Sequence, residues 1–351
     1  MLFSYWNIIE EKYIIGSTSG DQTDYQIKFI VYYDSIVNHN DIQNNMIFCD
    51  ESCRTDFGDI RFTNEDNVPL SYWIEKQVDS SYAVFWVKVD TILAAPELKK
   101  INIYYGKEDA TSLSNGDDTF LFFDDFNGTS LDTNKWDVQY WANPDFGYGT
   151  ASYTVADGAI VLSDAGAGSY RTIELWSKTF NAATSGMIIK ADFQTLEQYN
   201  LCYSFGMVAT KSITGYDREN GKLSYPGYVW TVDELDYHWF KLRSNSDIGY
   251  ATTIGLTDYT YYSKFISGSI VYWGETTANT NYFNSATTDE VTSENMYISL
   301  LSGCISGENT NANVMTIYYI AIRKVVEDEP SVVGYEPERK SLNYKLIVGN
   351  L

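Results

Sequence analysis

Short apolar runs in which every second residue is hydrophobic recur along the whole chain. The clearest runs are residues 25–31, 83–89, 101–105, 187–193, 239–242 and 317–322. Such alternation is typical of extended strands, whose successive side chains point to opposite faces. Gly, Asn, Asp and Ser separate the runs at the spacing of turns. The pattern therefore predicts an all-β protein of stacked antiparallel sheets.

Helical and membrane signals are weak. The sequence predicts one short helical turn at residues 110–113 and no amphipathic helix longer than three turns. No run approaches the ~18 apolar residues of a transmembrane helix, so we expect no membrane insertion. Residues 1–6 lack the basic and apolar regions of a signal peptide, so the protein either never used one or had it removed.

A polar segment divides the chain into two predicted domains. The Gly-containing segment 114–118 predicts a boundary between a first β-sandwich domain, residues 1–117, and a second, residues 118–325. Residues 326–351 form a Pro- and charge-containing tail that ends in the apolar run 344–348. We expect this tail to add a strand to its own chain or to exchange one with a neighbour.

Charge and histidine content remove two large classes of function. The chain of 351 residues has 47 acidic and 24 basic side chains, a net charge of −23. Such a surface repels phosphate, which excludes nucleic-acid binding through a basic footprint. Only two histidines are present, so His-dependent triads and zinc hydrolysis are poorly supported.

Four cysteines stand at positions 49, 53, 202 and 304. The Cys49-x3-Cys53 spacing resembles half of a metal site, but no second Cys or His pair accompanies it, which favours a small disulfide or free thiols over zinc. Cys202 and Cys304 lie in strand-like runs and could bridge if those strands are neighbours.

Two resemblances organise the rest of the chain. In the first domain, five blocks fall in order: residues 57–67, 70–75, 85–89, 103–107 and 110–112. This succession, over most of residues 5–117, resembles a family of domains of unknown function found in archaeal and bacterial surface proteins. Residues 123–132 leading into Trp136, together with residues 320–324, resemble a concanavalin-like or laminin-G-like jelly roll. The resemblances imply two β-sandwiches in series in a surface-exposed setting.

Three acidic residues near the start of the second domain could hold a calcium ion. Asp124, Asp125 and Asp132 offer oxygen ligands, and jelly rolls of the resembled type often hold calcium near this turn. The favoured alternative is that these residues form turns and cap backbone N–H groups. Asn127-Gly128-Thr129 is also an N-glycosylation sequon.

The jelly-roll resemblance raises a glycosidase hypothesis. Laminarinase-type glucanases share this fold and carry the pattern Glu-x-Asp-x-x-Glu. The segment beginning Glu234-Leu235-Asp236 approaches it, but Trp239 stands where the acid/base should be, so nothing would protonate the leaving oxygen. The sequence therefore predicts a protein that is not an enzyme.

Aromatic residues in polar segments form the candidate ligand surface. They are Tyr140, Trp141 and Tyr148 in one segment, and Tyr228 and Trp230 in another. Sugar rings stack on exposed aromatic faces, while neighbouring Asn and Asp side chains bond hydroxyl groups. The equally weighted alternative is that these rings close the ends of the sandwich core.

The leading functional hypothesis is a non-enzymatic, surface-exposed structural or adhesion protein. A virion component (capsid decoration, fibre or tail) that binds host-surface glycans and other assembly subunits fits a chain without an export signal. The alternative is a secreted or cell-surface carbohydrate-binding module. The expected locations are accordingly the virion surface, the cell surface or the extracellular medium.

Overall fold

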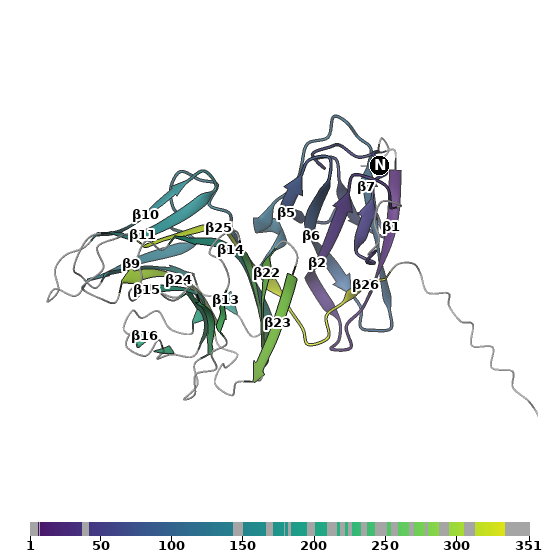
Figure 1. Ribbon diagram of the computed structural model, residues 1–351. Coiled ribbons are helices and arrows are strands. Elements are labelled where there is room, and N and C mark those ends of the chain that lie inside the picture. The colour runs from purple at the N-terminus through teal and green to yellow at the C-terminus, as the bar shows by residue number, and fades with distance from the viewer. Residues whose placement is uncertain are drawn as a thin grey trace, which may run out of the picture. The chain divides into compact units, whose positions relative to one another are not determined.

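The computed structural model confirms the predicted all-β class (Figure 1). It describes residues 6, 8–36, 42–142, 150–165, 171–178, 180–181, 184–194, 201–208, 216–217, 222–223, 227–232, 237–242, 251–253, 259–266, 270–277, 280–287, 295–304 and 313–333. The chain forms two compact units: residues 1–115 with 328–351, and residues 116–327. No described helix is long and apolar enough to cross a membrane.

The first unit contains two four-stranded sheets with the orders β26-β1-β7-β4 and β3-β2-β6-β5. Their strands are β1 (Ile8–Ile15), β2 (Gln22–Tyr32), β3 (Met46–Phe48), β4 (Arg61–Asn64), β5 (Tyr72–Val78), β6 (Tyr82–Ile92), β7 (Leu98–Tyr105) and β26 (Ser331–Val333). The pairs are antiparallel apart from β2 with β3.

Aromatic side chains from both sheets make the core of this unit. Phe62 on β4 lies 5.5 Å from Phe29 on β2 and 5.4 Å from Phe85 on β6, between ring centroids. Phe29 and Phe85 are fully buried. The alternation read from residues 25–31 and 83–89 thus turns one face of β2 and β6 toward β4, and burying these rings stabilises the pairing of the sheets.

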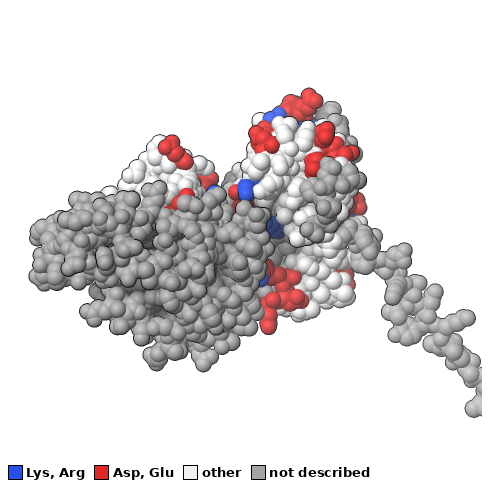
Figure 2. Space-filling view, viewed as in Figure 1, with Lys and Arg blue, Asp and Glu red and all other residues white. Residues whose placement is uncertain are grey.

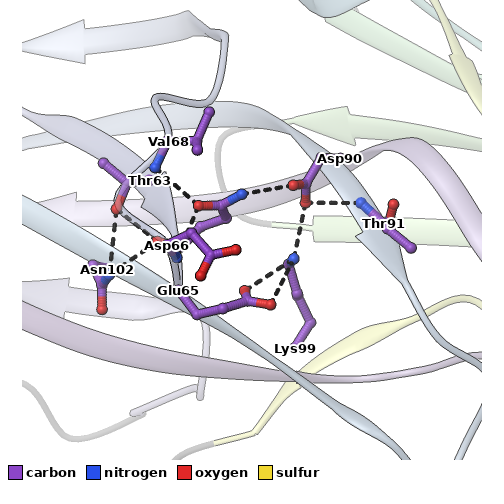
Figure 3. A network of polar contacts seen from close by, with 9 residues as sticks. Thr63, Glu65, Asp66, Val68, Asp90, Thr91, Lys99 and Asn102 are labelled. Carbon is purple, nitrogen blue, oxygen red and sulfur yellow. Dashed lines mark hydrogen bonds and ion pairs between the residues drawn. The ribbon is translucent and has the colours of Figure 1, made fainter.

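A polar network ties the two sheets together (Figure 3). The Asn64 side-chain amide on β4 donates to Asp90 Oδ2 on β6 at 2.8 Å, and Lys99 Nζ on β7 lies 3.0 Å from Asp90 Oδ1 and 2.9 Å from Glu65 Oε2. Burial alone would raise the pKa of Asp90, but hydrogen bonds from Asn64, Thr91 and Lys99 lower it. The network therefore holds the Asp90 carboxylate charged between the sheets.

The chain returns to its first unit after building the second. Strand β26 pairs antiparallel with β1, with Ser331 opposite Ile15. Just before it, Asp328 Oδ2 accepts from the Thr18 N–H at 3.0 Å, and Glu329 Oε2 accepts from the Tyr25 hydroxyl at 2.8 Å. The apolar run at 344–348 lies outside the described residues.

The helical turn expected at residues 110–113 is not formed, and this prediction was wrong. The backbone there bonds to tertiary partners instead: Leu113 N–H donates to the Tyr72 hydroxyl at 2.9 Å, and Thr111 O accepts from the Arg61 guanidinium. A short helix, α1 (Gly116–Thr119), follows a few residues later. Tertiary hydrogen bonds have overridden a weak local preference.

The second unit is a β-sandwich of two eight-stranded sheets with a small ribbon. One sheet contains β8 (Phe122–Asp124), β10 (Thr150–Ala156), β11 (Ala159–Ala165), β14 (Thr184–Gln194), β21 (Tyr259–Ile266), β22 (Ile270–Thr277), β23 (Thr280–Thr287) and β25 (Asn313–Lys324). The other contains β9 (Trp136–Ala142), β12 (Arg171–Ser177), β13 (Phe180–Asn181), β15 (Leu201–Val208), β18 (Gly227–Val232), β19 (Tyr237–Leu242), β20 (Ala251–Thr253) and β24 (Asn295–Cys304). The ribbon pairs β16 (Tyr216–Asp217) with β17 (Lys222–Leu223).

One apolar cluster fills the space between these two sheets. Alternate residues in the middle of β12, β14 and β24 contribute to it, including the fully buried Ile173, Leu175, Ile189 and Leu300. Trp136, at the start of β9, is 1% exposed and packs edge-on against Phe122 at 5.3 Å. The alternate residues of the same strands lie on the faces turned away from this core.

Lys264, on β21, gives a pH-dependent prediction. Burial and the nearby Arg323 lower its pKa to about 8 from 10.5. Between these values the unfolded chain binds the proton that the folded chain lacks, so this residue's contribution to stability rises with pH there. We expect Lys264→Met to stabilise the second unit by about 1 kcal/mol at pH 7, after allowance for solvent screening.

The measurement for Lys264 is urea unfolding of wild type and Lys264→Met from pH 7 to 10.5. Taking the difference cancels the titration of groups that both proteins share. The advantage of the variant should shrink as pH rises through 8. A constant difference across this range would contradict the assignment.

Candidate functional site

The face of β9, β12 and β24 that is turned away from the core carries buried polar groups. Glu174 lies between the core residues Ile173 and Leu175, so its side chain projects to the opposite face. The Ser299 hydroxyl on β24 donates to Glu174 Oε1 at 2.5 Å, and both residues are buried. Trp176, two residues along, is buried on the same face. A carboxylate, a hydroxyl and an indole therefore form a compact polar layer here.

Tyr140 is an exposed ring on the opposite face of this sheet from Glu174, because it shares a face with its register partner, the core residue Ile173. It lies on edge strand β9, opposite Ile173, and 56% of it is exposed. Among the described residues, it is the only aromatic in the group of exposed large hydrophobic side chains. Partial burial and the nearby Tyr153 on β10 raise the pKa of Tyr140. The neighbouring residue, Gln139, is exposed and lies opposite Glu174.

The other candidate aromatic residues are less fully placed. Trp141 follows Tyr140 on β9, opposite Thr172. Tyr228 and Trp230 are strand positions of β18, opposite the core residues Met207 and Phe205. The side chains of these three residues, and Tyr148 altogether, lie outside what the structure describes. The structure thus assigns an exposed surface to Tyr140 alone of the five.

The three predicted calcium ligands are engaged separately. Asp124 accepts the Trp136 indole N–H at 2.7 Å and the Phe126 N–H at 2.9 Å. Asp125 accepts from the Asn127 side chain at 2.6 Å, and Asp132 from the Asn134 N–H at 2.8 Å. Burial raises the pKa of Asp124 despite its hydrogen bonds. Within the described chain, no three His, Cys, Asp or Glu side chains are grouped to hold a metal ion.

The structure describes only in part the residues of two further predictions, the glycosidase motif and the Cys202–Cys304 pair. Glu234 and Asp236 lie outside the described residues, and Trp239 is described only as a position on β19. Strands β15 and β24 are neighbours, as a Cys202–Cys304 bridge would require. Cys202 is opposite Gly303 and Cys304 opposite Leu201, so the two cysteines are one register position apart rather than facing.

The first unit contains a polar cavity of about 980 Å³. Its wall combines the loop 51–55 with Tyr33, Asp59 and the segment 106–109. Arg54 makes a two-pronged contact with Asp56, at 2.8 and 2.6 Å, and that contact lowers the pKa of Asp56 to about 2. A cavity with paired charges of both signs can take a small polar molecule.

Asp59 holds the two sides of this cavity together. It is fully buried, and its carboxylate accepts three backbone N–H groups: Arg54 at 3.0 Å, Gly106 at 2.7 Å and Lys107 at 3.1 Å. Sequence reasoning missed this cavity and the Glu174–Ser299 pair. Each joins residues that are far apart in the chain. The one local signal was an isolated acidic residue inside an apolar run, as Glu174 is between Ile173 and Leu175.

A family model matches part of the chain. Residues 56–139 match a domain of unknown function (DUF2341). The matched segment begins between the cavity-lining residues Thr55 and Asp59 and ends on β9, so it crosses from the first unit into the second. A search of the curated proteins finds no match.

Solved structures resemble the chain over somewhat more than half its length. One, described under "Prominent members of the human gut microbiota express endo-acting O-glycanases to initiate mucin breakdown", has a TM-score of 0.46 and 12% identity, covering 59% of this chain and 99% of that one. The endo-β-1,3-glucanase from Pyrococcus furiosus has a TM-score of 0.41 and 11% identity, with coverages of 61% and 95%. Lectin II from Ulex europaeus has a TM-score of 0.41 and 9% identity, with coverages of 57% and 97%.

These similarities correct one expectation. Glycoside hydrolases recur among the similar structures, beside lectins. The prediction that the protein is not an enzyme was therefore wrong. It rested on one imperfect motif around Glu234, and a fold shared with glycoside hydrolases gives no reason to exclude enzymatic activity.

Proposed function

We propose that the second unit binds carbohydrate at the edge of its sandwich, on the exposed ring of Tyr140 of edge strand β9. The observation that carries the proposal is the exposed Tyr140 ring, since the other aromatic side chains of this unit whose burial the structure describes are buried or half-buried. An exposed phenol ring offers an apolar face to a sugar ring, and the hydroxyl at its edge both donates and accepts hydrogen bonds. The similar structures share only the fold with this chain, so the proposal rests on Tyr140 and not on those structures.

The first experiment is a glycan array probed with the labelled full-length protein, followed by calorimetry on the tightest ligand. Replacing Tyr140 by Ala should weaken binding about tenfold or more, because a central aromatic contact is lost. Leu121→Ala is the matched control, since Leu121 is 44% exposed in the same unit and should leave the affinity unchanged. Equal affinities for wild type and Tyr140→Ala would reject this surface, and an array without binding would reject the function.

The same ligand should be assayed for cleavage. Reducing ends that appear on incubation with the wild-type protein would add hydrolysis to binding, and Glu174→Gln would then test the buried carboxylate on the outer face of the neighbouring strand β12. A ligand that is bound and recovered intact would limit the activity to recognition.

We propose further that this contact serves attachment at an exposed surface, of a virion or of a cell. A net charge of −23 suits a solvated outer position, and Figure 2 marks acidic side chains over the described surface of the molecule. Light scattering separates the two settings. A defined oligomer supports an assembly subunit, and a monomer supports a free carbohydrate-binding module.

A further inference from the structure

The two cysteines of the first unit lie in a turn that brings them together. Ser52 N–H donates to Cys49 O at 2.9 Å, and the two residues between them, Asp50 and Glu51, have φ angles of 47° and 61°. Two successive left-handed residues closed by this hydrogen bond make a type I′ turn, which reverses the chain sharply. Cys53 follows immediately, so its side chain returns toward Cys49.

The turn is anchored rather than free. Cys49 N–H donates to Tyr32 O at 2.9 Å, and Glu51 N–H donates to Tyr33 O at 2.6 Å. These bonds attach the turn to the end of β2. Both cysteines are unoxidised in this structure. A backbone that already brings two thiols together needs little movement to join them.

The two thiols differ in access. Cys53 is 7% exposed and forms part of the cavity wall, whereas Cys49 is 1% exposed and does not line the cavity. Contact with Cys53 and burial raise the pKa of the Cys49 thiol. A reagent entering the cavity therefore reaches Cys53 first, and Cys49 stays a protonated thiol behind it.

We propose that Cys49 and Cys53 are a redox-active pair that forms a reversible disulfide in the wall of this cavity, with Cys53 as the attacking and Cys49 as the resolving residue. The oxidant is a low-molecular-weight disulfide such as oxidised glutathione. The Cys53 thiolate attacks one sulfur of the oxidant and expels a thiolate, giving a mixed disulfide. Cys49 gives its proton to the thiolate released in the first step, attacks the Cys53 sulfur and expels the second thiolate. The protein loses two electrons and two protons, and the oxidant becomes two thiols.

Oxidation should restrict the motion of the turn at residues 49–53, part of which lines the cavity together with Tyr33 and Arg54. The disulfide would add a covalent link beside the Ser52 N–H to Cys49 O hydrogen bond, so opening of that bond should become rarer. The redox state would thereby set how readily the cavity wall moves. This role concerns the first unit and is independent of carbohydrate binding by the second.

The test treats the full-length protein with oxidised glutathione and follows intact mass and peptide maps. Wild type should lose the mass of two hydrogen atoms within the peptide that holds residues 49 and 53. In Cys49→Ser the reaction should stop at a stable glutathione adduct on Cys53. In Cys53→Ser, adduct formation on Cys49 should be roughly tenfold slower or more. A variant with Cys202→Ser and Cys304→Ser is the matched control, and its 49–53 peptide should oxidise as in wild type.

Two measurements need no variant in the turn. Iodoacetamide should alkylate Cys53 before Cys49 in the reduced wild type, and hydrogen exchange at the Ser52 amide should slow after oxidation. Two thiols that stay reduced under excess oxidised glutathione would overturn the pair. Equal alkylation rates would overturn the assigned order of attack.

Discussion

Replacing Asp59 by Asn should lower the free energy of unfolding of the first unit by about 2–4 kcal/mol. The two side chains have nearly the same shape, so the change isolates hydrogen bonding. The carboxylate accepts three backbone N–H groups. Whichever way an amide is turned, its NH₂ group meets at least one of those donors, and a buried donor without an acceptor costs its full desolvation energy.

Chemical denaturation followed by hydrogen exchange on β4 and β7 would measure this loss unit by unit. Asp109→Asn is the control, because Asp109 lies on the same cavity wall with its side chain 82% exposed, and we expect no measurable change there. If Asp59→Asn matched that control, Asp59 would not be what holds the loop 54–59 against Gly106.

In the second unit, the largest loss should come from Trp136→Ala, at about 3–5 kcal/mol. Trp136 packs against Phe122 and Phe126, at 5.3 and 6.0 Å between ring centroids, and its indole N–H bonds to the buried Asp124. Truncation would leave a cavity at the start of β9 and remove a donor from Asp124. Both effects act in the same direction.

A second variant separates the two effects. Trp136→Phe keeps most of the ring but removes the N–H, so it should cost about 1–3 kcal/mol. Gln139→Ala, at an exposed position of the same strand, serves as the control and should change little. Calorimetric melting of the full chain would give all three values. Equal losses in Trp136→Phe and Trp136→Ala would mean that the hydrogen bond, and not packing, dominates.

The sequence predicted the strands well where one face is buried. The run 83–89 lies inside β6, and the run 317–322 lies inside β25. Alternation reports burial on one face, and burial decides which segments become strands. The division near residue 115 could also be predicted from the sequence, because a polar segment with glycine separates two apolar patterns.

The remaining features depend on partners distant in sequence. Nothing near Asp59 indicates that it will accept N–H groups from residues 106 and 107, and nothing near Glu174 indicates Ser299. Likewise β26 is three residues long, and its pairing with β1 is decided by an edge at the other end of the chain. Local periodicity carries no information about such pairs.

The return of the chain to β1 has a consequence for biosynthesis. Thr18 and its acceptor Asp328 are 310 residues apart, so the ribosome must finish the whole second unit before the first can be completed. Until then, the outer edge of β1 offers unpaired N–H and C=O groups to any other strand, including that of a second nascent chain. A gene truncated at residue 115 would encode that unfinished edge permanently, so an engineered first unit should join residue 115 to residue 328 through a short linker.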